Sequence, residues 1–257
     1  MLFIYIFIFV VGSVFGSFFN VCIHRIPQKK SIIFPGSHCP NCGIKINPLN
    51  NIPIFSYIFL KGKCRNCKTK IHPHYLLVEI LTPLLFIILF YRFGNVFSLI
   101  YLKYLLLFSI GLMIIFIDIF HKIIPDVLSL PLILTGIIFS LFPQTDISLS
   151  SSLIGAGSGF FLFVLIAMIF KYITKRDSLG GGDIKLIAAL GTFTGLYGII
   201  FIIFISSVLS LVTLIIIKHD LKKEFPFGPF LIFGSFLYII LGDYLISVYL
   251  GWFGLRL

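Results

Sequence analysis

Charged residues are scarce in this chain of 257 residues: only 11% of the sequence is Asp, Glu, Lys or Arg, and just 9 residues are acidic. So little charge, together with a mean hydropathy of +1.11, excludes a water-soluble globular domain. The 5 cysteines are too few for a disulfide-stapled secreted domain, and the 22 glycines follow no collagen-like triplet. Disorder is excluded because 31 phenylalanines supply far more apolar surface than a disordered chain carries. What remains is a polytopic membrane protein.

Long apolar runs bounded by charged or turn residues dominate the sequence. Such runs can cross a hydrocarbon core of about 30 Å as helices, so we expect an all-α membrane protein of about eight transmembrane helices. One tract, 184–217, is too long for a single crossing and is interrupted by Gly191, Gly195 and Gly198, which favours two crossings. The other expected spans are Met1–Ile23, Tyr75–Tyr91, Val96–Phe120, Val127–Phe142, Leu153–Tyr172 and Pro226–Leu250.

The formal net charge of +11 fits the same interpretation. If the first span starts outside, most Lys and Arg residues fall on the inner side of the membrane, as the positive-inside rule requires. Basic loops beside membrane spans meet anionic lipid head groups. Membrane lipid is therefore the expected partner of these cations, and nucleic-acid binding is not predicted.

A polar segment, 24–74, separates the first two spans and contains nine Lys or Arg residues but no acidic residue. It carries two C-x2-C knuckles, Cys39/Cys42 and Cys64/Cys67, separated by 21 residues, a spacing close to that of a zinc ribbon. Four thiolates close a tetrahedral shell, so we expect a structural Zn²⁺. A pair of disulfides is the alternative, which a reducing cytoplasm disfavours. The expected domains are a first transmembrane helix (1–23), a cytoplasmic zinc-ribbon-like loop with four cysteines (24–74) and a helical membrane domain (75–257).

Two carboxylates lie where ionisable groups are costly: Asp118 at the inner end of the third span, and Asp183 directly after three glycines that precede the next pair of spans. Both are expected at the same depth and on the same side of the membrane. Two facing carboxylates in a partly desolvated site would share a proton, which is the chemistry of an aspartic protease. The structural alternative is that Asp183 caps a helix and Asp118 pairs with Lys122 at i+4.

Other polar residues give weaker signals. Glu79, in the second span, either faces a functional cavity or lies near the head groups. Asp126 follows Pro125 before an apolar run, which favours helix capping.

These motifs, in their order, resemble the type IV prepilin peptidases, the GxGD-type aspartic proteases of bacterial inner membranes. Asp118 matches the first catalytic position of that family, and Asp183 matches the aspartate of its GxGD motif, with Gly180 and Gly182 as the glycines. Further matching segments are Gly16–Val21, Arg25–Pro27, the two knuckles, Asn51–Pro53, Tyr75–Glu79, Ile124–Asp126, Lys185–Gly191 and Pro226–Pro229. One departure is Phe120, where the family more often has a second acidic residue.

The resemblance implies an enzyme that removes the leader of prepilins or pseudopilins after a glycine, at the cytoplasmic face of the inner membrane. It also implies methylation of the new N-terminus with S-adenosylmethionine, although no motif marks the site of this methyl donor, the particular pilins or the oligomeric state. In this comparison Asp118 and Asp183 are the catalytic residues, and Gly180, Gly182, Lys185 and Glu79 support them. A peptidase without methyltransferase activity is one alternative, and a zinc-stabilised, proton-coupled transporter is another.

Overall fold

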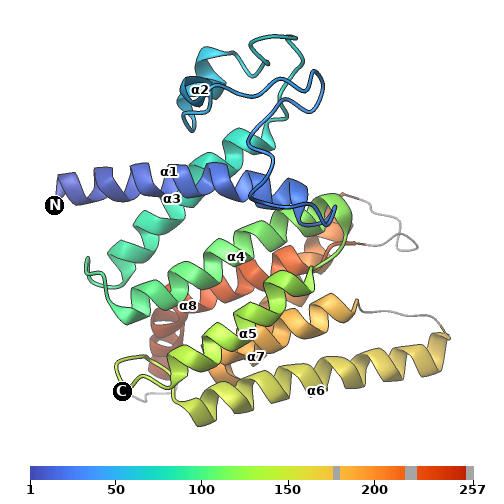
Figure 1. The fold of residues 1–257 in the computed structure, drawn as a ribbon. Helices are drawn as coiled ribbons and strands as arrows, with labels where there is room; N and C mark the ends of the chain where they lie inside the picture. The colour runs from blue at the N-terminus through green and yellow to red at the C-terminus, as the bar shows by residue number, and fades with distance from the viewer. Residues whose placement is uncertain (176–179, 218–224, 253–257) are drawn as a thin grey trace. The chain divides into compact units, whose positions relative to one another are not determined.

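The computed structural model describes residues 1–175, 180–217 and 225–252, and within these ranges the chain is helical with no strand. The predicted all-α fold is therefore confirmed (Figure 1). Five helices are long and apolar enough to cross a membrane, and two more apolar helices are shorter. The helices are α1 (Leu2–Arg25), α2 (Phe55–Phe59), α3 (His74–Arg92), α4 (Leu99–His121), α5 (Asp126–Ser140), α6 (Leu149–Thr174), α7 (Gly181–Ile216) and α8 (Gly228–Trp252), with a 3-10 turn at Pro48–Asn50.

The chain divides into two compact units, Met1–Tyr101 and Leu102–Leu257. In the first unit α1 packs against α3 along most of its length. Gly12 and Gly16 allow this close approach, because a Cβ at Gly12 would lie 2.6 Å from Pro83 Cα and one at Gly16 would lie 2.9 Å from Glu79 Cα. Small residues four apart commonly bring membrane helices together in this way.

In the second unit α7 lies at the centre and packs against α5, α6 and α8. Its first half touches α6 backbone to backbone, since a Cβ at Gly191 would lie 2.4 Å from the carbonyl of Gly155. Against α5 the fit is equally close: a Cβ at Gly136 would overlap the Thr192 side chain. Glycines in α5, α6 and α7 thus let these three helices meet without intervening side chains.

The helix α7 changes direction at Gly195, whose backbone angles (φ 66°, ψ −171°) are not helical. Contacts with α8 show that the chain turns back there. Proceeding along α8, Phe230 contacts Ser206, Gly234 contacts Ile202, and Tyr238 contacts Phe201. Since residue numbers rise along α8 while they fall along α7, the second arm of α7 runs antiparallel to the first part of α8. The two arms correspond to the two predicted segments of the 184–217 tract.

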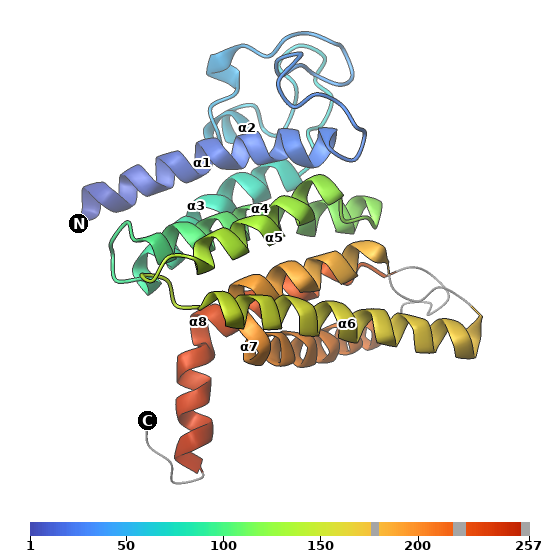
Figure 2. The same ribbon diagram turned by 60° about the horizontal axis from the view of Figure 1, so that its bottom comes forward.

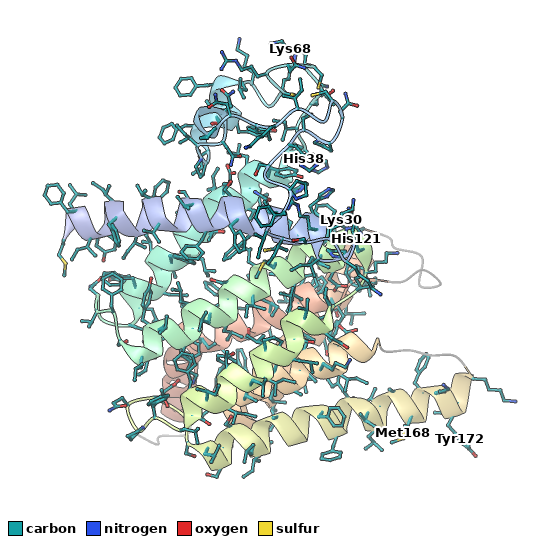
Figure 3. All side chains as sticks on the ribbon, viewed as in Figure 1. Lys30, His38, Lys68, His121, Met168 and Tyr172 are labelled. Carbon is teal, nitrogen blue, oxygen red and sulfur yellow. The ribbon has the colours of Figure 1, made fainter. Side chains whose placement is uncertain are left out.

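The outer face of α6 is strongly apolar and uncovered by the rest of the second unit. Figure 3 shows Met168 and Tyr172 projecting away from the neighbouring helices, and their exposed fractions are 58% and 88%. Exposed large apolar side chains on so long an apolar helix are typical of a lipid-facing surface. The described helices thus form a multi-pass membrane protein.

Candidate active site and cysteine cluster

Asp118 lies near the end of α4 and is 5% exposed. Its carboxylate Oδ2 accepts a hydrogen bond from the backbone N–H of Gly228, at an N···O distance of 3.0 Å. Gly228 is the first residue of α8, and the first N–H groups of a helix have no partner within it. They also carry the positive end of the helix dipole. The start of α8, rather than Lys122, the partner in the structural alternative, therefore both orients and stabilises a negative charge on Asp118.

A side chain at position 228 would press on the Asp118 carboxylate. A Cβ there would lie 2.8 Å from Asp118 Oδ2 and 3.2 Å from Ile124 Cδ1. Sequence reasoning noted the segment Pro226–Pro229 as a motif but gave it no task. Its contribution is a backbone donor, which no side-chain pattern reveals.

Asp183 is the third residue of α7, and Gly180 is the N-cap with an extended backbone. The Asp183 N–H donates to the Gly180 carbonyl at 3.0 Å, and the Asp183 carboxylate accepts a bond from the Gly180 backbone in return. The bond from the Gly180 N–H to the Asp183 carboxylate is one of the two bonds of a capping box, the one in which the side chain at N3 binds the backbone of the N-cap residue. The structural alternative, in which Asp183 itself is the N-cap, does not hold, because Gly180 occupies that position. The other carboxylate oxygen of Asp183, Oδ1, is buried and has no hydrogen-bond partner among the described residues.

Both aspartates lie beside Ile124, in the short connection after α4. Gly182, the neighbour of Asp183, packs against Ile124, since a Cβ at Gly182 would lie 2.8 Å from Ile124 Cβ, and Ile124 also touches Gly228 beside Asp118. The structure thus places the buried Asp118 of α4 and the partly buried Asp183 of α7 at the same end of the second unit. Their catalytic role stays a prediction.

Lys185 links two helices beside this site. Its Nζ donates to both carboxylate oxygens of Asp126, at 2.6 and 2.8 Å. Pro125, rather than Asp126, occupies the N-cap of α5, so the capping role predicted for Asp126 was wrong. The Lys185–Asp126 ion pair instead ties the first turn of α5 to the first turn of α7. Both side chains are partly exposed, so the pair contributes at most about 1 kcal/mol to stability.

Glu79 lies in the first unit, where its carboxylate holds a turn of the cysteine loop. Its Oε2 accepts the backbone N–H of Ile54 at 2.7 Å, and the Ser17 hydroxyl donates to the same carboxylate. Ile54 has φ 66° and ψ −56°, and Phe55 N–H donates to the Pro53 carbonyl at 2.7 Å, which defines a γ-turn with positive φ. A β-branched residue in this conformation costs about 1–3 kcal/mol. Glu79 helps to offset that strain by satisfying the one free N–H of the turn.

The four loop cysteines meet as the spacing predicts. The Sγ atoms of Cys39, Cys42, Cys64 and Cys67 all lie within 4.8 Å of one another, and all are free thiols, which argues against the disulfide alternative. A set of four thiolates fits Zn²⁺ in a closed, structural site, in which the metal would tie the two knuckles together. Zinc is implied by this donor set, and these four residues would hold it.

The two knuckles have the same local structure. In each, the second cysteine is followed by a residue with positive φ, Gly43 (70°) or Lys68 (58°). In each, the first cysteine accepts a bond from that residue, and an isolated bridge flanks the turn, His38 with Lys45 and Lys63 with Lys70. This repetition gives four thiols converging from two equivalent turns.

Thiol ionisation in the second knuckle also favours a metal. Hydrogen bonding from the Thr69 side chain, aided by its backbone N–H and by Asn41, lowers the pKa of Cys67 to about 5. Because the thiolate is the form that binds metal, Cys67 is a ready ligand at neutral pH.

A buried ion pair in the second unit was not predicted. Lys103 in α4 is fully buried, and its Nζ donates to Asp146 Oδ1 at 2.7 Å and to the Phe193 carbonyl at 3.2 Å. The Tyr104 hydroxyl donates to the other Asp146 oxygen. Phe193 lies two residues before the reversal at Gly195, so this network fixes the turn between the two arms of α7.

Comparison with known proteins matches both units of the chain. Residues 10–93 match the bacterial Peptidase A24 N-terminal domain, and residues 105–215 match the Type IV leader peptidase family. No solved structure matches.

Three relatives, each named prepilin leader peptidase/N-methyltransferase, illustrate the likeness. The protein of Dichelobacter nodosus is 35% identical over 255 residues, covering 88% of this chain and 88% of its own. That of Neisseria gonorrhoeae is 35% identical over 244 residues, covering 86% and 84%. That of Pseudomonas aeruginosa is 32% identical over 277 residues, covering 96% and 93%. With this identity over nearly its whole length, and with two helical units that match the two family domains in order, the chain belongs to the Type IV leader peptidase family.

Proposed function

We propose that this protein is an aspartic endopeptidase of the bacterial inner membrane that removes the leader of prepilins or pseudopilins, and that Asp118 and Asp183 carry the reaction. The observation that supports this most directly is that both aspartates flank Ile124: Asp118 lies beside Gly228, which touches Ile124, and Asp183 follows Gly182, which packs on Ile124. Family membership and the relatives' printed names support the substrate class. The family resemblance implies cleavage after the leader glycine. The positive-inside rule supports the cytoplasmic face as the side of the membrane where cleavage takes place.

The two carboxylates have different surroundings, which suggests different tasks. Asp118 receives an N–H at the start of α8, so it is the better placed to carry the negative charge and to act as the base. Asp183 keeps a buried Oδ1 without a partner among the described residues, which suits the protonated form and a bond to a substrate oxygen. Two ionised carboxylates at one buried site would repel each other, so a single shared proton is the favourable state.

In this mechanism Asp118 takes a proton from a water molecule while the oxygen of that water attacks the peptide carbonyl carbon. Asp183 gives its proton to the carbonyl oxygen, and a tetrahedral diol results. Asp118 then returns its proton to the leaving nitrogen as the C–N bond breaks, and Asp183 recovers a proton from one hydroxyl. No covalent intermediate with the protein forms.

The second activity is methylation of the new N-terminus, as the relatives' names indicate. S-adenosylmethionine would supply the methyl group. The described residues contain no glycine-rich nucleotide loop, so we assign no residues to this donor. A peptidase without methylation is distinguished by mass spectrometry of the product, where active transfer adds about 14 Da to the mature N-terminus.

Leader cleavage by purified variants tests the proposal. We expect Asp118→Asn and Asp183→Asn each to lose cleavage by at least about 10³-fold, since the pair acts as a unit. The matched control is Asp126→Asn, a neighbouring carboxylate engaged only with Lys185, for which we expect a loss of no more than about tenfold. Substantial cleavage by both dyad variants would reject the aspartic mechanism. Proton-coupled flux in vesicles without cleavage would favour the transporter instead.

A further inference from the structure

The short helix α2 of the cysteine loop presents an apolar face that no described part of the protein covers. Phe55, Ile58 and Phe59 are 58%, 59% and 81% exposed, and no residue of α2 is buried. Because they are spaced i, i+3 and i+4, the three side chains lie on one face of the helix. We call this set the Phe59 face.

A tether fixes where α2 begins. The γ-turn at Ile54 precedes the helix directly, and its N–H is held by the Glu79 carboxylate at 2.7 Å. The other end of the loop is fixed as well, because the Tyr57 hydroxyl donates to the Ile71 carbonyl at 3.2 Å. The position of α2 beside α3 is therefore set by specific contacts within the first unit.

This tether lies well inside the ends of the two spanning helices. Glu79 is five residues beyond the start of α3 at His74, which is about 7.5 Å along the helix axis. Gly16, which packs on Glu79, lies nine residues before the end of α1 at Arg25, about 13 Å along its axis. Figure 1 and Figure 2 both show the loop lying alongside the second half of α1. A loop that lies alongside a spanning helix, rather than beyond its end, can reach the membrane surface, where interfacial helices bind.

A cationic recess adjoins the Phe59 face. The recess has a volume of about 270 Å³ and borders the cysteine cluster at Cys64. Its other lining residues are two apolar ones, Phe59 and Leu60, and four cations, Lys61, Lys63, Arg65 and Lys68. The whole segment 24–74 contains no acidic residue that could neutralise these cations. Figure 3 shows Lys68 at the outer tip of the loop. A phosphate group complements a recess lined by four cations, of which Arg65 also donates to Asn50 Oδ1 at 3.2 Å, and an apolar face beside it complements acyl chains.

We propose that α2 and the cationic recess form a binding site for an anionic phospholipid of the adjoining leaflet. The acyl chains meet the Phe59 face, and the phosphate is held by the lysines and arginine of the recess. The zinc knuckles are thereby docked onto the membrane surface at a fixed depth, with Glu79 as the positioning residue for the turn that starts α2. This inference does not depend on the proposed peptidase activity.

Fluorescence of the full-length protein in lipid nanodiscs tests the depth. Trp252 is the only tryptophan, so Trp252→Phe provides a clean background for Phe59→Trp. The control is Lys45→Trp, at an exposed position of the same loop that lies outside α2 and does not line the recess. We expect brominated phosphatidylglycerol to quench the fluorescence of Phe59→Trp at least about threefold more than that of Lys45→Trp, in keeping with an interfacial depth. Equal quenching of the two would overturn the proposal. If the tryptophan variant does not fold, photo-crosslinking from benzoyl-phenylalanine at position 59 replaces it, with capture of lipid expected and absence of lipid adducts contradicting it.

Lipid retention tests the recess. The wild type, purified in mild detergent, should keep phosphatidylglycerol in preference to phosphatidylcholine. Lys63→Glu removes one cation of the recess and should lower the retention of phosphatidylglycerol by about fivefold. Lys30→Glu, which lies outside the recess, is the charge-matched control and should retain the lipid. Unchanged retention in Lys63→Glu would overturn the head-group assignment. Displacement of the lipid by inorganic phosphate alone would show a free-phosphate site and would also overturn it.

Discussion

Three consecutive glycines precede Asp183, and the structure predicts a different outcome for an alanine at each of the last two. A Cβ at Gly181 meets nothing within 4 Å. A Cβ at Gly182 would lie 2.8 Å from Ile124 Cβ, 3.2 Å from its carbonyl oxygen and 3.4 Å from its Cα. Because these atoms belong to the backbone or lie next to it, Ile124 cannot move aside by changing rotamer. Gly182→Ala must therefore shift the start of α7 and, with it, Asp183.

The magnitudes follow from packing. Overpacking of this kind costs about 1–3 kcal/mol, and alanine's better helix propensity returns up to about 1 kcal/mol, so the stability of Gly182→Ala should fall by no more than about 3 kcal/mol. Activity should fall further, because misplacing a reacting group by about 1 Å can cost about 100-fold. Gly181→Ala has no such contact and should keep the wild-type rate within about twofold.

The assay is leader cleavage by the purified enzyme in nanodiscs, with the thermal midpoint measured on the same preparations. We expect Gly182→Ala to lose roughly ten- to a hundredfold in kcat/KM while it remains folded. Cleavage by Gly182→Ala at the Gly181→Ala rate would refute the idea that contact with Ile124 positions Asp183.

Three further variants test other parts of the structure. Gly228→Ala should slow cleavage about ten- to a hundredfold, because it disturbs a charge-assisted hydrogen bond worth about 1.5–3 kcal/mol; an unchanged rate would show that the α8 N–H is dispensable. Cys39→Ser should reduce bound zinc from about one ion per chain, as measured by elemental analysis, whereas Cys22→Ser, outside the cluster, should not; equal zinc in both would remove the assignment of the four-cysteine cluster as a metal site. Asp146→Asn should destabilise the fold by about 3–5 kcal/mol in denaturation, more than Lys103→Met does, because it leaves a fully buried ammonium unpaired while Asp146 is partly exposed; the reverse order would contradict the ion-pair geometry.

The positions of the membrane helices and the clustering of the four loop cysteines could be predicted from the sequence. An apolar run that crosses the membrane must satisfy the hydrogen bonds of its backbone within the segment, which only a helix does for a single run. The observed helices therefore begin and end within a few residues of the expected spans. Two C-x2-C knuckles predicted the thiol cluster, since the turn that brings each pair together is encoded locally. The glycines at 191, 195 and 198 predicted that the long tract is interrupted, and the reversal occurs at Gly195.

What could not be predicted depends on contacts between distant segments. The donor to Asp118 is a backbone N–H from α8, and any residue type except proline carries that group, so no motif distinguishes it. Asp126 was expected to cap a helix because local sequence favours it, but Lys185 in α7 offers a charged partner instead. The γ-turn at Ile54 was equally hidden, because isoleucine disfavours positive φ and the compensation comes from Glu79 in another helix.

The central claim is that Asp118 and Asp183 act together on one water molecule. Cleavage rates of Asp118→Asn, Asp183→Asn and the double variant, measured over a range of at least about 10⁵-fold, test it most directly. We expect all three variants to fall to the same low rate. Either single substitution already abolishes the shared proton, so the second substitution in the double variant causes no further loss of cleavage. Two modest, multiplicative losses would show that the carboxylates act independently and would contradict a single hydrolytic site.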